Sequence, residues 1–504
     1  MKNTILGCAV LAASLGLVGC GSSSSDNNSP SVSSSSQAGS NSSSAGNSSS
    51  AAAQNTYAFT NAEGVSTVAY TGQVVRQVMI EDIKAYISKI TRSGDPTVKA
   101  DLMSLFENPS SANDTANIQM SIEGYTLAQT TYGDISTGKS LVGKIAGGYV
   151  QDGSPAGEKP ETLINGTFFG WQEGLSAGAK PYDLVVYYFD QLQALAAKAD
   201  TSSVETVAGA ATIDKVYVDE NGVDYLQLAQ KFLLMAVGFS QGVSDYLGPN
   251  RDFANELTID GDKPYTTAEH HFDEGFGYFG ATPNYAELSD SEIIAAAVDT
   301  DMNGIIDLTS EYNFGQSVNC AKRDVGATND PDLTGEAISG FIEGRTILAA
   351  ASAAGSLTAE QETALNAAIA KAAGAWEKCI AATVVHYIND VIADMAEFSN
   401  GQFASIDNFY NLAKHWGEMK GFALGLQFNP YSPFREPGTG NLAMISYGAD
   451  QSADLEDVLT WMGDAPVLAD ASEMAIQDYE DALLKARDVL QVAYGFDSEN
   501  VADW

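Results

Sequence analysis

The sequence predicts a mainly α-helical fold: a helical bundle with long irregular loops and a short extended strap near its N-terminal side. One version of this prediction divides the bundle into two pseudo-symmetric halves. Three observations lead to this prediction. Apolar residues recur with the 3.6-residue helical period over most of the chain beyond residue 70. Capping-box pairs stand before several of these stretches. Strands do not alternate with helices as they would in an α/β fold.

Residues 57–70 are short and β-branched, with Gly64 and Gly72 as breaks, which predicts the strap. An apolar stripe at steps of three, four and one predicts the first helix, through Val75, Val78, Met79, Ile83, Tyr86, Ile87 and Ile90. Further helices are predicted over 181–199, 223–247, 267–279, 289–298, 334–353, 358–397, 403–424 and 470–494. Three of them begin at capping-box pairs, namely Thr266 with Glu269, Ser289 with Glu292, and Thr358 with Gln361. The long loops are rich in Gly, Asp and Pro and cover 148–165, 248–266 and 425–446.

Residues 1–19 have the pattern of a signal peptide. Lys2 gives a positive start, and residues 5–18 form an apolar stretch too short to span a membrane stably. The sequence Leu17-Val18-Gly19-Cys20 is similar to the lipobox at which bacterial lipoproteins are cut and lipidated. We therefore expect Cys20 to carry the lipid and to hold the protein in the bacterial cell envelope. Because Gly21 follows in place of a retaining aspartate, the outer membrane is expected, facing the periplasm or the surface.

Residues 20–55 are predicted to be a flexible tether, and residues 56–504 a mainly helical domain. The stretch 21–55 holds 17 serines, no aromatic residue and a single charge, so it cannot bury enough apolar surface to fold. The whole chain has 25 Lys and Arg against 65 Asp and Glu, a formal net charge of −40. Charge of this sign repels phosphate, which excludes nucleic acid as a partner and leaves membrane contact to the lipid alone.

Two of the four histidines begin similar His-x-x-Glu segments. His271 with Glu274 and His415 with Glu418 are each followed by glycines and aromatic residues, at a spacing of 144 residues (415 minus 271). Residues i and i+3 share a helix face, so each pair can offer a nitrogen and a carboxylate to one point, as metal sites in bundles do. The alternative is a buried, hydrogen-bonded pair that holds helices in register. That alternative is favoured for His386, which lies one turn before Asp390.

Residues 299–311 resemble a calcium-binding loop. The ligands are expected from side chains at alternate positions and from one carbonyl: Asp299, Asp301, Asn303, the Ile305 carbonyl, Asp307 and Glu311. Gly304 permits the sharp turn, and Ile306 stands at the usual apolar position. The acid comes one residue late, since Ser310 occupies the twelfth position. A solvated Asp-rich turn is the alternative, and a single loop points to a structural Ca²⁺ site.

The mature domain keeps two cysteines, Cys320 and Cys379. In an oxidising compartment such a pair is compatible with one disulfide, and equally with two buried thiols.

Three separated motifs resemble a bacterial lipoprotein family known as domain of unknown function 4856, over about residues 57–500. They are Tyr57-Ala-Phe59 with Ser66-Thr67-Val68-x-Tyr70-x-Gly72-Gln73-x-x-Arg76, then His270-His271-Phe-Asp-Glu274-x-Phe-Gly-Tyr-Phe279-Gly280, and His415-Trp-x-Glu418-Met-Lys-Gly-Phe422. The family has no established activity. Its members are similar in setting to imelysin-like proteins, helical lipoproteins with a Gly-x-His-x-x-Glu motif that are linked to iron uptake. Glu269 and Ala413 stand where that motif has Gly.

Three functions follow as hypotheses. The first is a lipid-anchored binding protein or uptake accessory that handles iron or zinc through His271, Glu274, His415 and Glu418, with Ca²⁺ in its loop. The second is a non-catalytic interaction module that docks an imelysin-like or other extracytoplasmic protein. The third, a metallohydrolase or peptidase, is less favoured because the H-E-x-x-H peptidase signature is missing.

Overall fold

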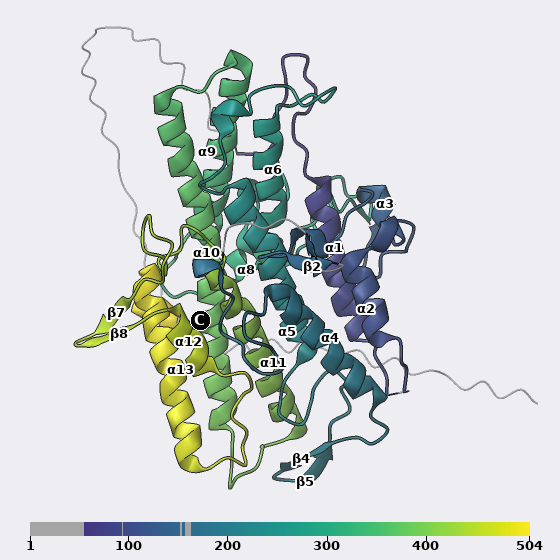
Figure 1. Cartoon of the computed structure of the whole chain (residues 1–504), viewed down its shortest axis with the longest axis vertical. Helices are drawn as coiled ribbons and strands as arrows, with labels where there is room; N and C mark the ends of the chain where they lie inside the picture. Colours follow the sequence, from purple (N-terminus) through teal and green to yellow (C-terminus); the bar gives the residue numbers. More distant parts are fainter. Residues whose placement is uncertain (1–54, 93, 152–153, 157–162) are drawn as a thin grey trace, which may run out of the picture. The chain divides into compact units, whose positions relative to one another are not determined.

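The computed structural model describes residues 55–92, 94–151, 154–156 and 163–504 (Figure 1). These residues fall within one unit, Ala53–Trp504. The predicted signal peptide, Cys20 and all but the last residue of the predicted tether lie outside the described residues.

The described chain is mainly α-helical, as predicted. Its α-helices are α1 (Thr71–Ile87), α2 (Val98–Glu107), α3 (Tyr132–Ile135), α4 (Pro181–Ala197), α5 (Tyr225–Leu233), α6 (Thr267–Phe279), α7 (Asp290–Ile294), α8 (Gly315–Val325), α9 (Leu333–Ala354), α10 (Ala359–Ala396), α11 (Ile406–Ala423), α12 (Leu455–Met462), α13 (Glu473–Tyr494) and α14 (Ser498–Asp503). The strands are short: β1 (Thr126–Leu127), β2 (Tyr149–Gln151), β3 (Ser154–Ala156), β4 (Ser203–Thr206), β5 (Gly209–Thr212), β6 (Ile305–Ile306), β7 (Ile445–Gly448) and β8 (Gln451–Ala453).

The strands pair into two-stranded sheets. Antiparallel hairpins form from β2–β3, β4–β5 and β7–β8, whereas β1 and β6 pair in parallel although they are far apart in sequence. The β4–β5 and β7–β8 hairpins project from the edges of the helical body (Figure 1). The hairpins each pair neighbouring segments, whereas the β1–β6 pair joins distant parts of the chain.

α10 is the central helix of the bundle. It begins at the predicted capping box, where the Thr358 hydroxyl accepts from the Gln361 backbone N–H and the Gln361 side chain accepts from the Thr358 N–H. α8, α9, α11 and α13 all pack against it. By length and composition α10 is the one helix of the described residues that could cross a membrane, and 61% of its apolar window is buried in the body. Packing against its neighbours accounts for its apolar composition.

α5 lies among α1, α4 and α11 and continues beyond its end as π-helix. The π-helical segments are Leu234–Phe239 and Gln241–Tyr246. The predicted helix over 223–247 therefore has nearly the right extent, but its second half is wound more widely. Gly242 permits a close approach here, because a Cβ atom at this position would lie 2.6 Å from the Trp376 ring of α10.

A buried ionic network fastens the N-terminal strap to α6 and α9. The Arg345 side chain of α9 has no exposed surface. It donates to Glu269 Oε1, Asp273 Oδ1 and Thr67 Oγ1, each at 2.8 Å. The Tyr57 hydroxyl of the strap donates to the same Asp273 oxygen at 2.7 Å. Because buried charges must be paired and hydrogen-bonded, this network fixes where the extended strap meets the helices.

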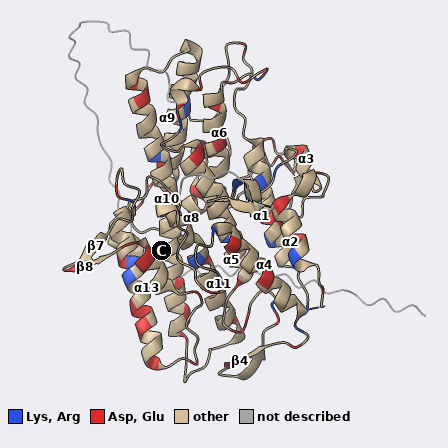
Figure 2. Cartoon of the chain, in the orientation of Figure 1, with Lys and Arg blue, Asp and Glu red and all other residues tan. Residues whose placement is uncertain are grey.

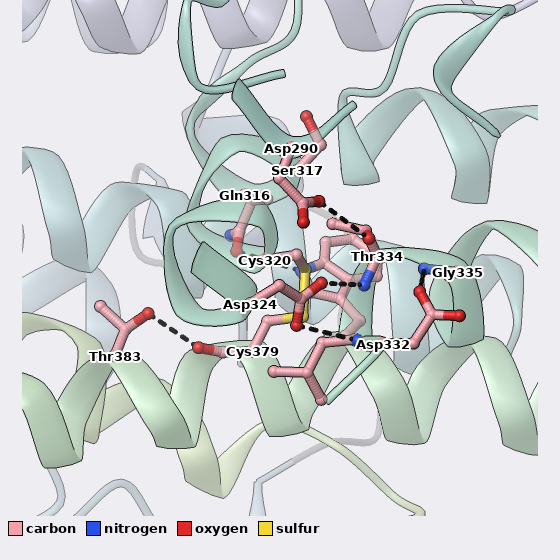
Figure 3. The surroundings of a disulfide bond; sticks show 12 residues. Asp290, Gln316, Ser317, Cys320, Asp324, Asp332, Thr334, Gly335, Cys379 and Thr383 are labelled. Atoms are coloured by element: carbon pink, nitrogen blue, oxygen red, sulfur yellow. Dashed lines mark hydrogen bonds between the residues drawn. A yellow bond between two sulfur atoms is a disulfide. The ribbon is translucent and has the colours of Figure 1, made fainter. Parts of the chain in front are cut away.

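Cys320 of α8 and Cys379 of α10 form a disulfide, with their Cα atoms 4.8 Å apart (Figure 3). Of the two interpretations of this cysteine pair, the structure has the disulfide and not two buried thiols. Beside it, the Asp324 carboxylate accepts from the backbone N–H groups of Leu333 and Thr334 at 3.0 and 2.9 Å, which ties the start of α9 to the end of α8. The disulfide closes a segment of 59 residues that contains all of α9.

Three predicted helix starts are confirmed: capping boxes form at Thr266, Ser289 and Thr358. The helix predicted over 289–298 is shorter, because the backbone turns at Ala296 with φ of 65°. Helices α2, α3, α8, α12 and α14 were not among the predicted elements.

Candidate metal centre

Loop 299–311 is held in place by strand pairing and by an apolar anchor. Ile305 and Ile306 form β6, which pairs in register with Thr126 and Leu127 of β1. The Ile306 side chain is fully buried, as expected for the apolar position of a calcium-type loop. The chain then leads into α8, so the loop joins the strand pair to the bundle.

The backbone wraps around the Asp299 carboxylate. Gly304 has φ of 76°, a conformation that glycine adopts without the strain of a side chain. The backbone N–H groups of Asn303 and Gly304 donate to the two Asp299 oxygens at 3.1 and 2.9 Å. The Asn303 side-chain oxygen accepts from the Ile305 N–H. These bonds produce the turn that the sequence pattern predicts.

Asp299, Asp301 and Glu311 come together. Each offers a carboxylate oxygen, and the three oxygens lie within 4.8 Å of one another. Glu311 reaches this point although it is one residue late, and its side chain is fixed by the backbone N–H groups of Thr300 and Asp307 at 2.9 and 3.1 Å. Three carboxylates with no nitrogen or sulfur donor suit a hard cation such as Ca²⁺.

Asp307 is not part of this three-carboxylate group. Its Oδ1 accepts from the Gln129 amide at 2.8 Å and from the Thr309 N–H at 2.8 Å. Burial alone would raise the pKa of Asp307, but the hydrogen bonds from Thr309 and Gln129 hold it below its usual value. Asp307 therefore connects the loop to the segment after β1 while keeping its negative charge.

His271 and Glu274 of α6 have separate partners. His271 Nδ1 lies 2.9 Å from Glu256 Oε2 and 2.9 Å from an Arg251 guanidinium nitrogen. Glu274 accepts from the Gln73 amide of α1 at 2.8 Å. Both side chains thus take part in contacts between elements, and they do not point to one shared ligand position.

His415 of α11 lies between two carboxylates of α10. Its Nδ1 is 2.7 Å from Asp394 Oδ2, and its Nε2 is 3.7 Å from Asp390 Oδ2. His386 Nε2 lies 3.3 Å from that same Asp390 oxygen. Burial, with the nearby charge of Arg323, lowers the pKa of His386 to about 3. His386 is therefore neutral near pH 7, and its hydrogen-bonding role agrees with the favoured interpretation of the sequence.

Glu418 forms ion pairs with lysines. Its Oε1 lies 3.2 Å from Lys231 Nζ of α5, and its Oε2 lies 3.6 Å from Lys414 Nζ. Burial would raise the pKa of Glu418, but the two lysine charges hold it below its usual value.

The predicted four-residue metal site is not assembled. Within the part of the chain that the structure describes, the one group of three or more His, Cys, Asp or Glu ligand atoms within 4.8 Å is Asp299, Asp301 and Glu311. Since His271 and His415 also have different surroundings, the structure lends no support to pseudo-symmetric halves. Iron or zinc binding by His271, Glu274, His415 and Glu418 stays a prediction.

The sequence reasoning missed the carboxylates around His415. His386, Asp390 and Asp394 are spaced by four residues and so share one face of α10. This four-residue spacing could have identified His386, Asp390 and Asp394 as a group on one face of the helix. The packing of α11 on this face, which brings in His415, has no signature in either segment.

Three short stretches match patterns found in nucleotide-binding proteins or serine hydrolases, and none has the required context. Residues 133–140 fit the phosphate-loop spacing, but they begin inside α3 and the Gly138 N–H donates to Asp114. Residues 275–280 fit G-x-G-x-x-G, but Gly275 and Gly277 lie inside α6. Residues 238–242 fit G-x-S-x-G, but they lie in the π-helical region with Ser240 fully buried.

The comparisons assign the family. The sequence model described as Domain of unknown function (DUF4856) matches residues 54–375, and the chain belongs to this family. No curated protein sequence and no solved structure matches the chain. The His415 motif lies beyond the matched residues. The other two motifs lie within the matched residues and contact each other in the structure. The Tyr57 ring of the strap stacks on the Phe276 ring of α6, with ring centroids 3.7 Å apart.

Proposed function

We propose that the protein is a lipid-anchored, extracytoplasmic binding protein that uses Ca²⁺ as a structural ion. The observation that carries the calcium part of this proposal is the convergence of Asp299, Asp301 and Glu311 in a loop anchored on β1 and the bundle. Calcium is abundant outside the cytoplasm, so a site of modest affinity would be filled there. The ion would join three like charges that otherwise repel one another.

The disulfide supports the extracytoplasmic part of the proposal. Disulfides persist in oxidising compartments and are rare in the cytosol. The Cys320–Cys379 bridge lies between two helices of the bundle, where both residues are buried. Together with the lipobox-like sequence at Cys20, it favours a cell-envelope location. A binding role is favoured over a catalytic one because His271, His415 and Glu418 are each paired within the fold.

The calcium site is tested with the Asp299→Asn/Asp301→Asn variant. A site with Kd of about 10⁻⁴ M would stabilise the native protein by about 1.4 kcal/mol at about 1 mM Ca²⁺. For a body of this size, that corresponds to a rise in Tm of about 1–2 °C. We expect the native sequence to show this rise in scanning calorimetry and a binding heat in titration calorimetry, and the variant to show neither.

Glu362→Gln/Asp478→Asn, at exposed positions of α10 and α13, removes the same number of charges; it is the matched control and should keep the response to Ca²⁺. An identical calcium response in the loop variant and in the native sequence would exclude this loop as the site.

Lipidation is tested with Cys20→Ser. Without the thiol no acyl chains can be attached at this position, so we expect an alkyne-tagged fatty acid fed to the cells to label the native protein and not the variant. Cys8→Ser is the control, because Cys8 belongs to the predicted signal peptide and its replacement should not affect the labelling. Fatty-acid labelling of the Cys20→Ser protein equal to that of the native protein would contradict the anchor.

A further inference from the structure

A pocket of about 540 Å³ lies apart from the calcium loop, where four segments meet. The segments are residues 171–173, α4, the turn at 219–225 that leads into α5, and residues 464–475, which follow α12 and include the first turn of α13. Its volume is in the range of pockets that take small organic ligands. None of the residues that line it is Lys, Arg or His.

One wall of the pocket is aromatic. Trp171, Tyr187 and Tyr225 line it, and the Trp171 and Tyr187 ring centroids are 6.1 Å apart. Trp171 and Tyr225 are buried, at 5% and 3% exposure, so the half-buried Tyr187 is the most accessible of the three rings. The Trp171 indole N–H donates to the Glu173 carbonyl at 2.9 Å, which fixes the indole. Gly174 has φ of 69°, and a Cβ atom there would lie 2.2 Å from the Tyr187 ring. Glycine therefore lets the chain lie directly against this ring and hold it in the wall.

The remaining lining carries four carboxylates: Glu173, Asp219, Asp464 and Asp470. Asp464 Oδ2 accepts from the backbone N–H groups of Gln172 and Glu173 at 2.8 and 2.9 Å, so its position is fixed. Lys420, buried behind the lining, has its Nζ 3.8 Å from Asp464. Glu173 and Asp470 are exposed, and neither forms an ion pair with any residue that the structure describes.

The lining of the pocket is therefore negatively charged. Along the ribbon as a whole, Asp and Glu positions are more frequent than Lys and Arg positions (Figure 2). Burial raises the pKa of Tyr187, and the negative charges of Glu173, Asp219 and Asp464 raise it further. Aromatic faces and carboxylates together are the two features that attract a cation out of water.

We propose that this pocket binds a linear polyamine, with ammonium groups at the carboxylates and methylene groups on the aromatic wall. A linear ligand is favoured because a second hollow, of about 620 Å³, shares Trp171 and Asp464 with the first and carries a further acid, Glu456. A chain with several ammonium groups can lie across both hollows. The proposal names the ligand class for the binding role proposed above and rests on that role, although the pocket and the calcium loop are separate sites.

The test uses titration calorimetry of the full chain with spermidine in about 0.15 M NaCl, which screens weak surface attraction. The Glu173→Gln/Asp470→Asn variant removes two exposed carboxylates and should bind spermidine at least tenfold more weakly. Glu362→Gln/Asp478→Asn removes the same charges from exposed positions on α10 and α13 and should bind it unchanged. Tyr187→Leu, which removes an aromatic face, should also weaken binding.

Equal weakening in the pocket and control variants would indicate general attraction to an acidic protein and would overturn the proposal, as would the absence of spermidine binding. Binding of the neutral sugar maltose that is lost in Glu173→Gln/Asp470→Asn, without spermidine binding, would also overturn it. The Asp299→Asn/Asp301→Asn variant separates the two proposals. Spermidine binding that persists when the calcium response is absent supports the pocket even if the calcium proposal fails.

Discussion

Replacing Arg345 by methionine is expected to lower the free energy of unfolding by about 3–5 kcal/mol. The side chain is fully buried, and its removal leaves Asp273 and Glu269 without their cationic partner. The loss would be a large fraction of the total stability of a folded domain, about 5–15 kcal/mol. Urea unfolding followed by circular dichroism measures the change.

The effect of Arg345→Met should depend on pH. Burial raises the pKa of Asp273 to about 6 even with Arg345 present. Without the guanidinium it should rise further, so the folded protein binds a proton more tightly than the unfolded chain. The stability of the variant should therefore increase as the pH falls from about 8 to about 5. A destabilisation that stays constant over this range would contradict an unpaired Asp273 as its cause.

Two controls isolate the buried network. Lys371→Met removes the exposed ion pair with Glu343, whose Nζ–Oε1 distance is 3.0 Å, and should cost at most about 1 kcal/mol. Asp273→Asn combined with Arg345→Met removes the stranded charge and should be less destabilising than the sum of the single changes.

Removing the Cys320–Cys379 disulfide should cost about 4 kcal/mol. The bridge closes a segment of 59 residues, and the chain-entropy relation gives a value of about this size for such a loop. Cys320→Ala/Cys379→Ala is the variant of choice, because both positions are buried and alanine leaves no polar group unpaired. The midpoint of urea unfolding should fall in this variant, and in the native sequence after reduction.

The reducing agent should not shift the midpoint of the double alanine variant, which serves as its own control. Equal midpoints for the oxidised and reduced native protein would show that the bridge does not stabilise the fold. Because the bridged segment contains Arg345, the disulfide and Arg345 variants should also couple, with their effects departing from additivity.

Much of the helical framework could be predicted from local patterns. α6 and α10 each begin at a capping box, a pattern that spans four consecutive residues and can be recognised in the sequence. Both predicted starts are confirmed. α8 was missed because its buried face includes Gln316, Ser317 and Arg323, so its apolar stripe is weak. Gln316 is satisfied by a distant partner, because its amide donates to the Leu234 carbonyl. Such contacts have no local signal.

The candidate site residues also divide into those set by local sequence and those set by packing between helices. The turn of the calcium-type loop depends on residues within five positions of one another. Of the four carboxylates predicted to bind Ca²⁺, Asp299, Asp301 and Glu311 lie together, whereas Asp307 bonds to Gln129 and Thr309. The His-x-x-Glu pairs show only that two side chains share one face of a helix. Which face a neighbouring helix presents is decided by packing, and here it brings Glu256 to His271 and Asp394 to His415.

If the protein is lipid-anchored as proposed, the attachment of the strap determines how the body responds to a pull from the membrane. The Tyr57 backbone N–H donates to the Pro283 carbonyl at 2.7 Å, and its hydroxyl is held by Asp273. Tension along the preceding chain would therefore enter at the junction of α6 and α9, not at a terminal helix that could unwind turn by turn. A lipid-tethered body built this way should resist stretching until the contacts of the strap break, and should then unfold in one cooperative step.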